Sequence, residues 1–311
     1  AFTGSTELRV IGAAATAGSV PFGSYALFLG IVLIVAGFGF KISMVPFQMW
    51  VPDVYEGAPT PITAYLSVAS KAAGFAVILR VFYAAFGELD VDWGALFAVL
   101  SLLSMVVGNL VAIAQSNIKR MLAYSTIAQG GYILIGLAAI ATHAPDQETL
   151  GPGGVLFYLT AYAATNLAAF FSIITITNTT GSDDIDAFAG MGRRAPVISA
   201  ILGFAMLSLI GIPPTAGFMG KLYIFNAAIH SDLVWLAVAG VVNSVVSAYY
   251  YLRVIRTMYL TPGESEERAS SSIAMRFALG LTGLGILAVG VLPGPLMEFA
   301  ENSVAVLLPA A

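Results

Sequence analysis

Long apolar runs separated by short polar segments recur along the whole chain. A helix needs about 20 apolar residues to cross a bilayer, and the strands of a membrane barrel would instead alternate over about ten residues. The pattern therefore predicts an all-α, polytopic transmembrane helical bundle of about eight spans. The runs cover residues 24–55, 61–86, 93–116, 120–141, 153–178, 196–229, 233–260 and 273–292.

Proline interrupts two of these runs. The first run contains Pro46, and the sixth contains the segment GIPPTAG with Pro213 and Pro214. A proline frees backbone groups, which is tolerated at membrane depth only where the backbone is buried in protein or faces water. Paired interrupted spans are the usual sequence sign of an ion site in a transporter. We therefore expect two broken helices, near Pro46 and near Pro213.

Three lysines lie within otherwise apolar runs. Lys41 precedes the first break, Lys221 follows the second, and Lys71 lies well inside the second run. Each would cost about 2.5–3.5 kcal/mol to insert at a helix centre, and lysine, unlike arginine, can lose its proton when buried. The three positions favour a role in proton transfer. The alternative for Lys41, near the end of its run, is an ammonium group that extends to the interface.

Acidic residues are absent from the interior of every run. A proton relay built from lysines alone lacks a carboxylate that would tune it. We therefore expect the acid partner in another polypeptide or upstream of residue 1. The chain begins with Ala1 in a loop-like stretch, which suggests a fragment of a longer protein.

The remaining basic residues are distributed unequally between the two sides of the expected bundle. Only Arg9 and Arg80 lie on the side of the membrane where the odd-numbered runs start. Cytoplasmic loops carry an excess of Lys and Arg, so the N-terminus should lie outside and the segments 116–120, 179–195 and 253–272 in the cytoplasm. The side that follows odd-numbered runs carries Lys119, Arg120, Arg193, Arg194, Arg253, Arg256, Arg268 and Arg276.

Composition agrees with a membrane protein and argues against redox chemistry in this chain. Hydrophobic residues make up 59% and charged residues 10% of the sequence, whereas soluble domains carry about 25% charged residues. The chain has no cysteine, which excludes thiolate-held iron–sulfur clusters. It also lacks a glycine-rich strand–turn–helix segment that could bind a dinucleotide.

Three ordered segments carry a family resemblance. They are FKISMVPFQMWVPDVYEGAPTPITAYLSVASKAAGF, NIKRMLAYSTIAQGGY and GIPPTAGFMGKLYIF. They resemble the subunit N family of NADH–quinone oxidoreductase, the antiporter-like membrane-arm subunits of respiratory complex I. The resemblance implies fourteen transmembrane helices with two inverted five-helix repeats, of which this chain would hold the last eight helices. The implied division is an outer loop remnant at 1–23, the end of the first repeat at 24–92, the second repeat at 93–260, and an inner loop, last span and outer tail at 261–311.

The resemblance also implies roles for individual residues. It places proton-path lysines at Lys41, Lys71 and Lys221, and it places the acid partner of Lys41 on a helix that this sequence does not contain. Relatives often have histidine where this chain has Gln129. Gln129, whose amide does not titrate, and Tyr124 are therefore candidates for a relay, and the alternative is that both only satisfy hydrogen bonds between helices.

The favoured interpretation is a proton-translocating membrane-arm subunit of NADH:quinone oxidoreductase, multi-pass in the cell inner (plasma) membrane. It would be an enzyme only as part of that translocase, with no redox activity or cofactor of its own. NADH, FMN, iron–sulfur clusters and quinone would belong to other subunits. Expected partners are the other membrane-arm subunits, the lipid bilayer and further N-terminal helices of the same subunit, and no nucleic acid.

Two alternatives stay open. The chain could belong to a related multisubunit cation/proton antiporter, which would have no enzyme activity. It could also be a purely structural remnant of a membrane arm. The segments DVYEGAPTP and SVASK favour the first interpretation over both.

Overall fold

The computed structural model describes residues 5–17, 23–86, 93–140, 149–263 and 267–305. Within these ranges the chain is built from helices and short connections, without a strand. The α-helices are α1 (Leu8–Thr16), α2 (Gly23–Ile42), α3 (Trp50–Gly57), α4 (Thr60–Tyr65), α5 (Lys71–Phe86), α6 (Trp93–Ile113), α7 (Ile118–Ile140), α8 (Leu150–Thr180), α9 (Met191–Arg194), α10 (Pro196–Ile210), α11 (Ala216–His230), α12 (Val234–Leu260), α13 (Ile273–Val291) and α14 (Gly294–Ala305).

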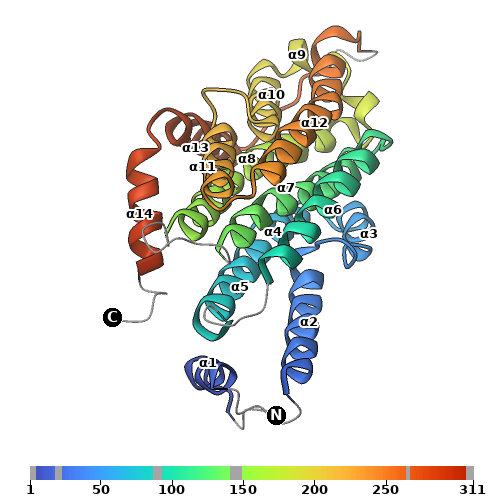
Figure 1. Ribbon diagram of the computed structural model, residues 1–311. Coiled ribbons are helices and arrows are strands. Elements are labelled where there is room, and N and C mark those ends of the chain that lie inside the picture. The colour runs from blue at the N-terminus through green and yellow to red at the C-terminus, as the bar shows by residue number, and fades with distance from the viewer. Residues whose placement is uncertain (1–4, 18–22, 87–92, 141–148, 264–266, 306–311) are drawn as a thin grey trace.

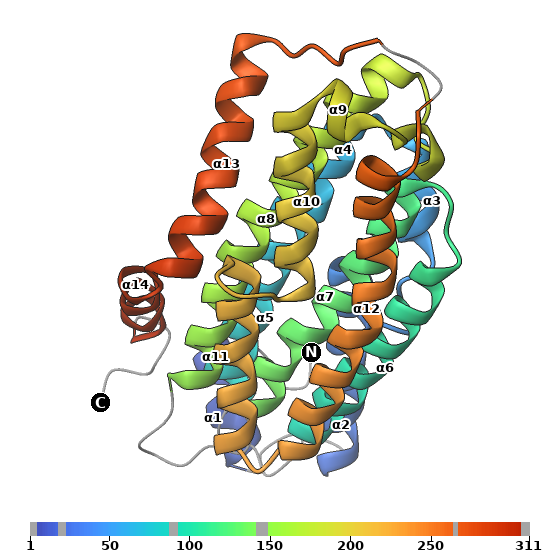
Figure 2. The same ribbon diagram turned by 90° about the horizontal axis from the view of Figure 1, so that it is seen from above.

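The predicted bundle of membrane-spanning helices is confirmed. Seven helical stretches of the described residues are long and apolar enough to cross a membrane, one of them formed jointly by α4, a π-helical segment and α5. The sixth predicted run, 196–229, is divided between two shorter helices, α10 and α11. Figures 1 and 2 show α7, α8, α10 and α12 side by side, with α13 along the outside of the bundle.

α7 lies at the centre of this bundle, and almost all of its residues are buried. It packs closely against α6 because glycines let the two backbones approach. A Cβ added at Gly108 would lie 2.7 Å from the backbone nitrogen of Ala128, and one added at Gly131 would lie 2.7 Å from that of Met105. Asn117 directly precedes α7, and its Oδ1 accepts hydrogen bonds from the backbone N–H groups of Lys119 and Arg120, as an N-cap does.

Both predicted breaks are present. Pro46 lies in the non-helical segment between α2 and α3, and Pro213 and Pro214 lie between α10 and α11. α10 ends at Gly211, whose φ of 93° lies in the left-handed region that glycine adopts without strain. The second break therefore depends on a glycine as well as on its prolines.

Three elements differ from the sequence expectations. The expected outer loop remnant contains α1, and the expected outer tail contains α14, which is too short to span a bilayer and packs against α8. The second run is not a uniform helix, because residues Leu66–Ser70 form a π-helical segment between α4 and α5. Residues 1–4, 264–266 and 306–311, which belong to the predicted outer loop, inner loop and outer tail, lie outside the described residues. The repeat boundaries at 92 and 260 stay predictions.

Candidate functional site

Lys221 lies just beyond the second break, and its side chain turns back toward the end of α10. Its Nζ donates hydrogen bonds to the carbonyl oxygens of Leu209 at 3.0 Å and Ile210 at 2.8 Å, and to Oγ of Ser244 at 3.0 Å. The same Nζ lies 4.4 Å from the centre of the Tyr132 ring, a cation–π contact. Only 4% of Lys221 is exposed.

All the partners of this ammonium group are electrically neutral. The two carbonyls belong to the last turn of α10, where carbonyl groups have no partner within the helix and form the negative end of its dipole. The break therefore does more than interrupt a helix. It presents a helix C-terminus to a cation in the interior of the bundle.

Lys71 is equally buried, with 4% of its surface exposed. Its Nζ donates to the backbone oxygen of Thr126 at 3.1 Å. It is the first residue after the π-helical segment, a feature frequent at functional sites. One helical turn earlier, the Ser67 hydroxyl accepts a hydrogen bond from Asn166 of α8 at 2.6 Å.

Gln129 connects the surroundings of the two buried lysines. Its Nε2 donates to the Leu209 oxygen at 3.1 Å, the same oxygen that Lys221 uses, and to the Tyr251 hydroxyl at 3.3 Å. Its Oε1 accepts a hydrogen bond from Tyr158. Gln129 follows Thr126 by three residues on α7, so both lie on one face of that helix.

A line of polar groups therefore crosses the bundle through α7. It runs from Lys71 to Thr126, along one turn of helix to Gln129, and through the shared Leu209 oxygen to Lys221. Hydroxyl groups of Tyr158, Tyr162 and Tyr251 flank it. Tyr124, the other relay candidate, is half-buried, and no side-chain hydrogen bond of Tyr124 is found within the described ranges.

Lys41 differs from the other two lysines because its side chain is exposed. Among the residues that the structure describes, no hydrogen bond or ion pair of Lys41 is found. Its aliphatic part runs beside α5, since a Cβ added at Gly74 would lie 3.4 Å from Lys41 Cγ. The structure thus brings Lys41 next to the helix that begins with Lys71 without burying it.

The backbone of the first break is nevertheless well supported. The N–H of Val45 donates to Oγ of Ser104 on α6 at 3.0 Å. The rings of Phe40 and Trp50 meet across the break with their centres 5.3 Å apart, and the Trp50 indole donates to the Phe40 oxygen at 3.1 Å. Among the described residues, the first break therefore has packing partners but lacks partners for its lysine.

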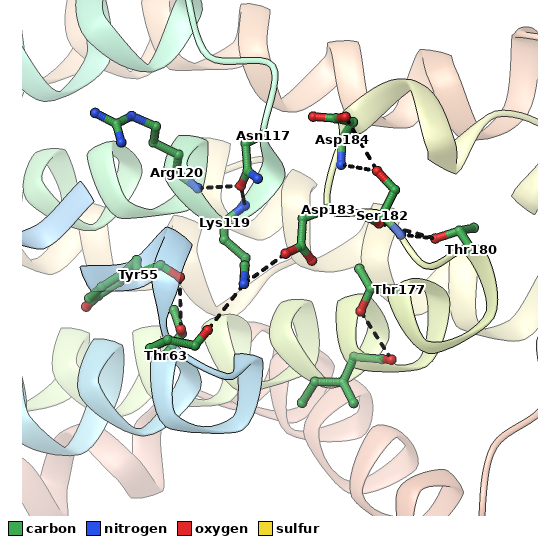
Figure 3. Close-up of polar contacts among 12 residues, drawn as sticks. Tyr55, Thr63, Asn117, Lys119, Arg120, Thr177, Thr180, Ser182, Asp183 and Asp184 are labelled. Carbon is green, nitrogen blue, oxygen red and sulfur yellow. Dashed lines mark hydrogen bonds and ion pairs between the residues drawn. The ribbon is translucent and has the colours of Figure 1, made fainter. Parts of the chain in front are cut away.

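A second polar cluster lies at the end of the bundle where α3 and α9 are found (Figures 2 and 3). Lys119 forms an ion pair with Asp183 at 2.8 Å and donates to the Ala58 oxygen at 3.2 Å. The neighbouring Arg120 forms ion pairs with Asp53 and Glu56, both at 2.7 Å. These contacts fasten α3, the second half of the first broken helix, to the start of α7.

This cluster brings together segments with the predicted basic excess. Asn117 pairs with Asp184 in an isolated bridge, and the guanidinium of Arg194 donates to the Glu267 oxygen at 2.7 Å. The segments 116–120, 179–195 and 253–272 therefore share one end of the molecule.

Several residues of the site were not anticipated from the sequence. Ser244 and Tyr132 contact Lys221, and Asn109 donates to the Tyr132 hydroxyl at 3.4 Å. These residues lie on α12, α7 and α6, far apart in the chain. The sequence signals each of these residues only as a polar residue within an apolar run. Many other residues of the bundle have the same signal.

Comparison with known proteins gives the family. The family described as NADH:quinone oxidoreductase/Mrp antiporter, TM matches residues 1–247. NADH-quinone oxidoreductase subunit N of Dehalococcoides mccartyi is 49% identical over 278 residues, which are 88% of this chain and 57% of that protein. The chain thus spans less than two thirds of that relative.

Solved structures agree. A chain of respiratory complex I from Thermus thermophilus is 35% identical and superimposes with a TM-score of 0.74 over 93% of this chain and 64% of its own length. A chain of the Mrp complex from Dietzia sp. DQ12-45-1b has a TM-score of 0.82 over 96% of this chain and 65% of its own length, and its 20% identity shows a common fold. The chain therefore belongs to the NADH:quinone oxidoreductase/Mrp antiporter family of transmembrane proteins.

Proposed function

We propose that this chain forms part of a proton-translocating membrane-arm subunit of NADH:quinone oxidoreductase. The observation that carries the proposal is the pair of buried lysines, Lys71 and Lys221, with a line of polar groups on α7 between them. A buried lysine can take up and release a proton. A proton would pass between the two through Thr126, Gln129 and the water that such polar groups can hold.

Lys41 would be the switch at the entrance of this path. Its stem lies beside the helix that begins with Lys71, and its ammonium group is free to meet a partner from outside the described residues. An acidic side chain from another helix of the same subunit, or from a neighbouring subunit, would complete that site. A carboxylate within about 4 Å would favour the charged lysine, and its withdrawal would favour proton release.

The proposal includes an orientation and a division of labour. The basic end of the bundle would face the cytoplasm and the N-terminus would face outward, because cytoplasmic segments carry the excess of Lys and Arg. Electron transfer, with its NADH, FMN, iron–sulfur clusters and quinone, would take place in other subunits of the complex. This chain would contact other membrane-arm subunits and lipid.

The alternative is a subunit of a multisubunit cation/proton antiporter. It is favoured by the shared fold with a chain of the Mrp complex and by a family that includes both kinds of assembly. Dependence on sodium separates the two. Proton uptake driven by NADH without added sodium supports the first proposal, and proton movement that requires a sodium gradient supports the second.

The direct test replaces Lys221 in the complete subunit, assembled in its complex in membrane vesicles. Lys221→Met keeps most of the volume and removes the charge, whereas Lys221→Arg keeps the charge and cannot release a proton at usable pH. Both variants should lose most NADH-driven proton uptake, measured with a pH-sensitive dye. If arginine restores uptake and methionine does not, Lys221 supplies only a structural charge and the proposal is wrong.

A further inference from the structure

The donors and acceptors around Lys221 balance one for one. An ammonium group has three N–H donors, and the structure supplies three acceptors, which are the oxygens of Leu209 and Ile210 and Oγ of Ser244. Tyr132 adds its ring face without taking a hydrogen bond from Nζ. The charged state of Lys221 is therefore satisfied in hydrogen bonds.

The same three partners also satisfy the neutral amine. A neutral amine has two N–H donors and one lone pair, so it needs two acceptors and one donor. Carbonyl oxygens can only accept, but a hydroxyl group can accept or donate. Ser244 is the single partner of the three that can change roles, and a rotation of its O–H is enough to do so.

The surroundings of Ser244 suit such a rotation. While Lys221 donates to Oγ, the Ser244 hydroxyl donates to the Tyr132 hydroxyl at 3.4 Å. That distance is long for an O–H···O bond, so the hydroxyl gives up little when it turns toward Nζ. Ser244 is also half-buried, whereas Lys221 is almost fully buried.

We propose that Ser244 is a positioning residue that holds Lys221 in place in both protonation states and sets the direction in which its proton leaves. The inference rests on the proposed function. The Nζ–H bond directed at Ser244 is the one that breaks, because the other two N–H groups stay on carbonyls. That proton moves to Oγ of Ser244 while the hydroxyl releases its own proton to water, and the O–H bond that remains donates to the lone pair of Nζ.

The test compares Ser244→Ala with Ser244→Thr in the complete subunit, assembled in its complex. Alanine removes the hydroxyl, and the neutral amine is left with an unsatisfied lone pair. Proton uptake should slow on the order of tenfold, and the solvent deuterium isotope effect should rise because proton release becomes rate-limiting. Threonine keeps the hydroxyl and should restore both quantities.

Ser172→Ala is the matched control. The Ser172 hydroxyl lies in a membrane helix too, is fully buried, and among the described residues donates only to the Ala168 oxygen of its own helix at 2.8 Å. It should leave rate and isotope effect unchanged. Normal uptake in Ser244→Ala, or slow uptake with a normal isotope effect in both Ser244 variants, would overturn the inference.

Lys221→Met separates this inference from the function on which it rests. If Lys221→Met abolishes uptake while Ser244→Ala does not slow it, the function stands and the role of Ser244 is wrong. If Lys221→Met pumps normally, the proposed function is wrong and the role of Ser244 is wrong with it.

Discussion

The two broken helices share a sequence pattern but differ in the surroundings of their lysines. Each has an apolar run, a proline break and a lysine, yet Lys221 is buried with three hydrogen-bond acceptors and an aromatic ring, whereas Lys41 is exposed. The difference lies in what surrounds them. α7, α8, α10, α12 and α13 pack around or beside α11, whereas α2 is covered mainly by α5 and leaves large apolar side chains exposed.

The comparison teaches that a break by itself does not make an ion site. At the second break, the end of α10 supplies carbonyl acceptors for Lys221, and Ser244 of α12 supplies a further acceptor. The first break has its backbone supported by α6 but leaves the ammonium of Lys41 to whatever packs against α2. A lysine site is complete only when neighbouring helices supply its acceptors.

The largest contrast should appear in the chemical reactivity of the three lysines. When this chain is solubilised in mild detergent and treated with a small amine-reactive reagent, Lys41 should be modified at least about tenfold faster than Lys71 or Lys221, because buried amines react only after local opening. Mass spectrometry of the digested chain measures the three rates. Equal rates would mean that the two breaks do not differ in burial.

Gly211→Ala should damage the second break directly. Gly211 has a φ of 93°, and a Cβ there would lie 3.0 Å from Cδ of Lys221. We expect a loss of about 1–3 kcal/mol of stability, seen as a lower thermal unfolding temperature in detergent, together with loss of proton uptake in the assembled complex. The control is Gly37→Ala in α2, where an added Cβ meets nothing within 4 Å. A comparable loss in both variants would show that Gly211 is not special.

Substitution of two glutamines tests whether the polar groups near each break contribute to stability and to proton uptake. Gln129→Leu deprives the Tyr158 hydroxyl of its acceptor, although Leu209 and Tyr251 keep other partners. The expected costs are about 1 kcal/mol and slower proton uptake. Near the first break, Oε1 of Gln48 is buried without a partner among the described residues, so Gln48→Leu should be neutral or stabilising.

Stability in detergent and dye-monitored uptake are measured for both glutamine variants. The contrast fails if Gln48→Leu impairs uptake as strongly as Gln129→Leu does. In that case the first break also contains a working polar path.

The sequence predicted the spans, the two breaks and the burial of Lys71 and Lys221, because apolar length, proline and a cation within an apolar run are local signals. It did not predict the π-helical segment before Lys71, since no residue type at Leu66–Ser70 specifies the extra residue in that turn. Nor did it predict Ser244 as a partner of Lys221, because 23 residues separate them and packing alone joins them.

The sequence left the exposure of Lys41 open for a similar reason. The pattern of α2 is apolar on all sides, which is equally suitable for contact with lipid or with another helix. The ion pairs of Lys119 and Arg120 were also missed, because charge at a span end identifies a membrane surface but not which carboxylates will be reached.

The smallest expected effect belongs to Tyr132→Phe, which separates the two contributions of this ring to the second break. Phenylalanine keeps the face that lies 4.4 Å from Nζ of Lys221 and loses only the hydroxyl. That hydroxyl accepts from Ser244 and Asn109 at 3.4 Å each, and Asn109 retains a bond to the Asn243 oxygen. The loss should therefore be about 0.5 kcal/mol or less, with nearly normal proton uptake.

Tyr132→Leu is the complement, because it removes the ring as well as the hydroxyl. Loss of a desolvated cation–π contact should cost about 2 kcal/mol, and uptake should fall more than in Tyr132→Phe. Thermal unfolding and dye-monitored uptake of both variants give the comparison. If phenylalanine proves as damaging as leucine, the hydroxyl rather than the ring face holds Lys221, and the polar chain through Asn109 becomes an essential part of the second break.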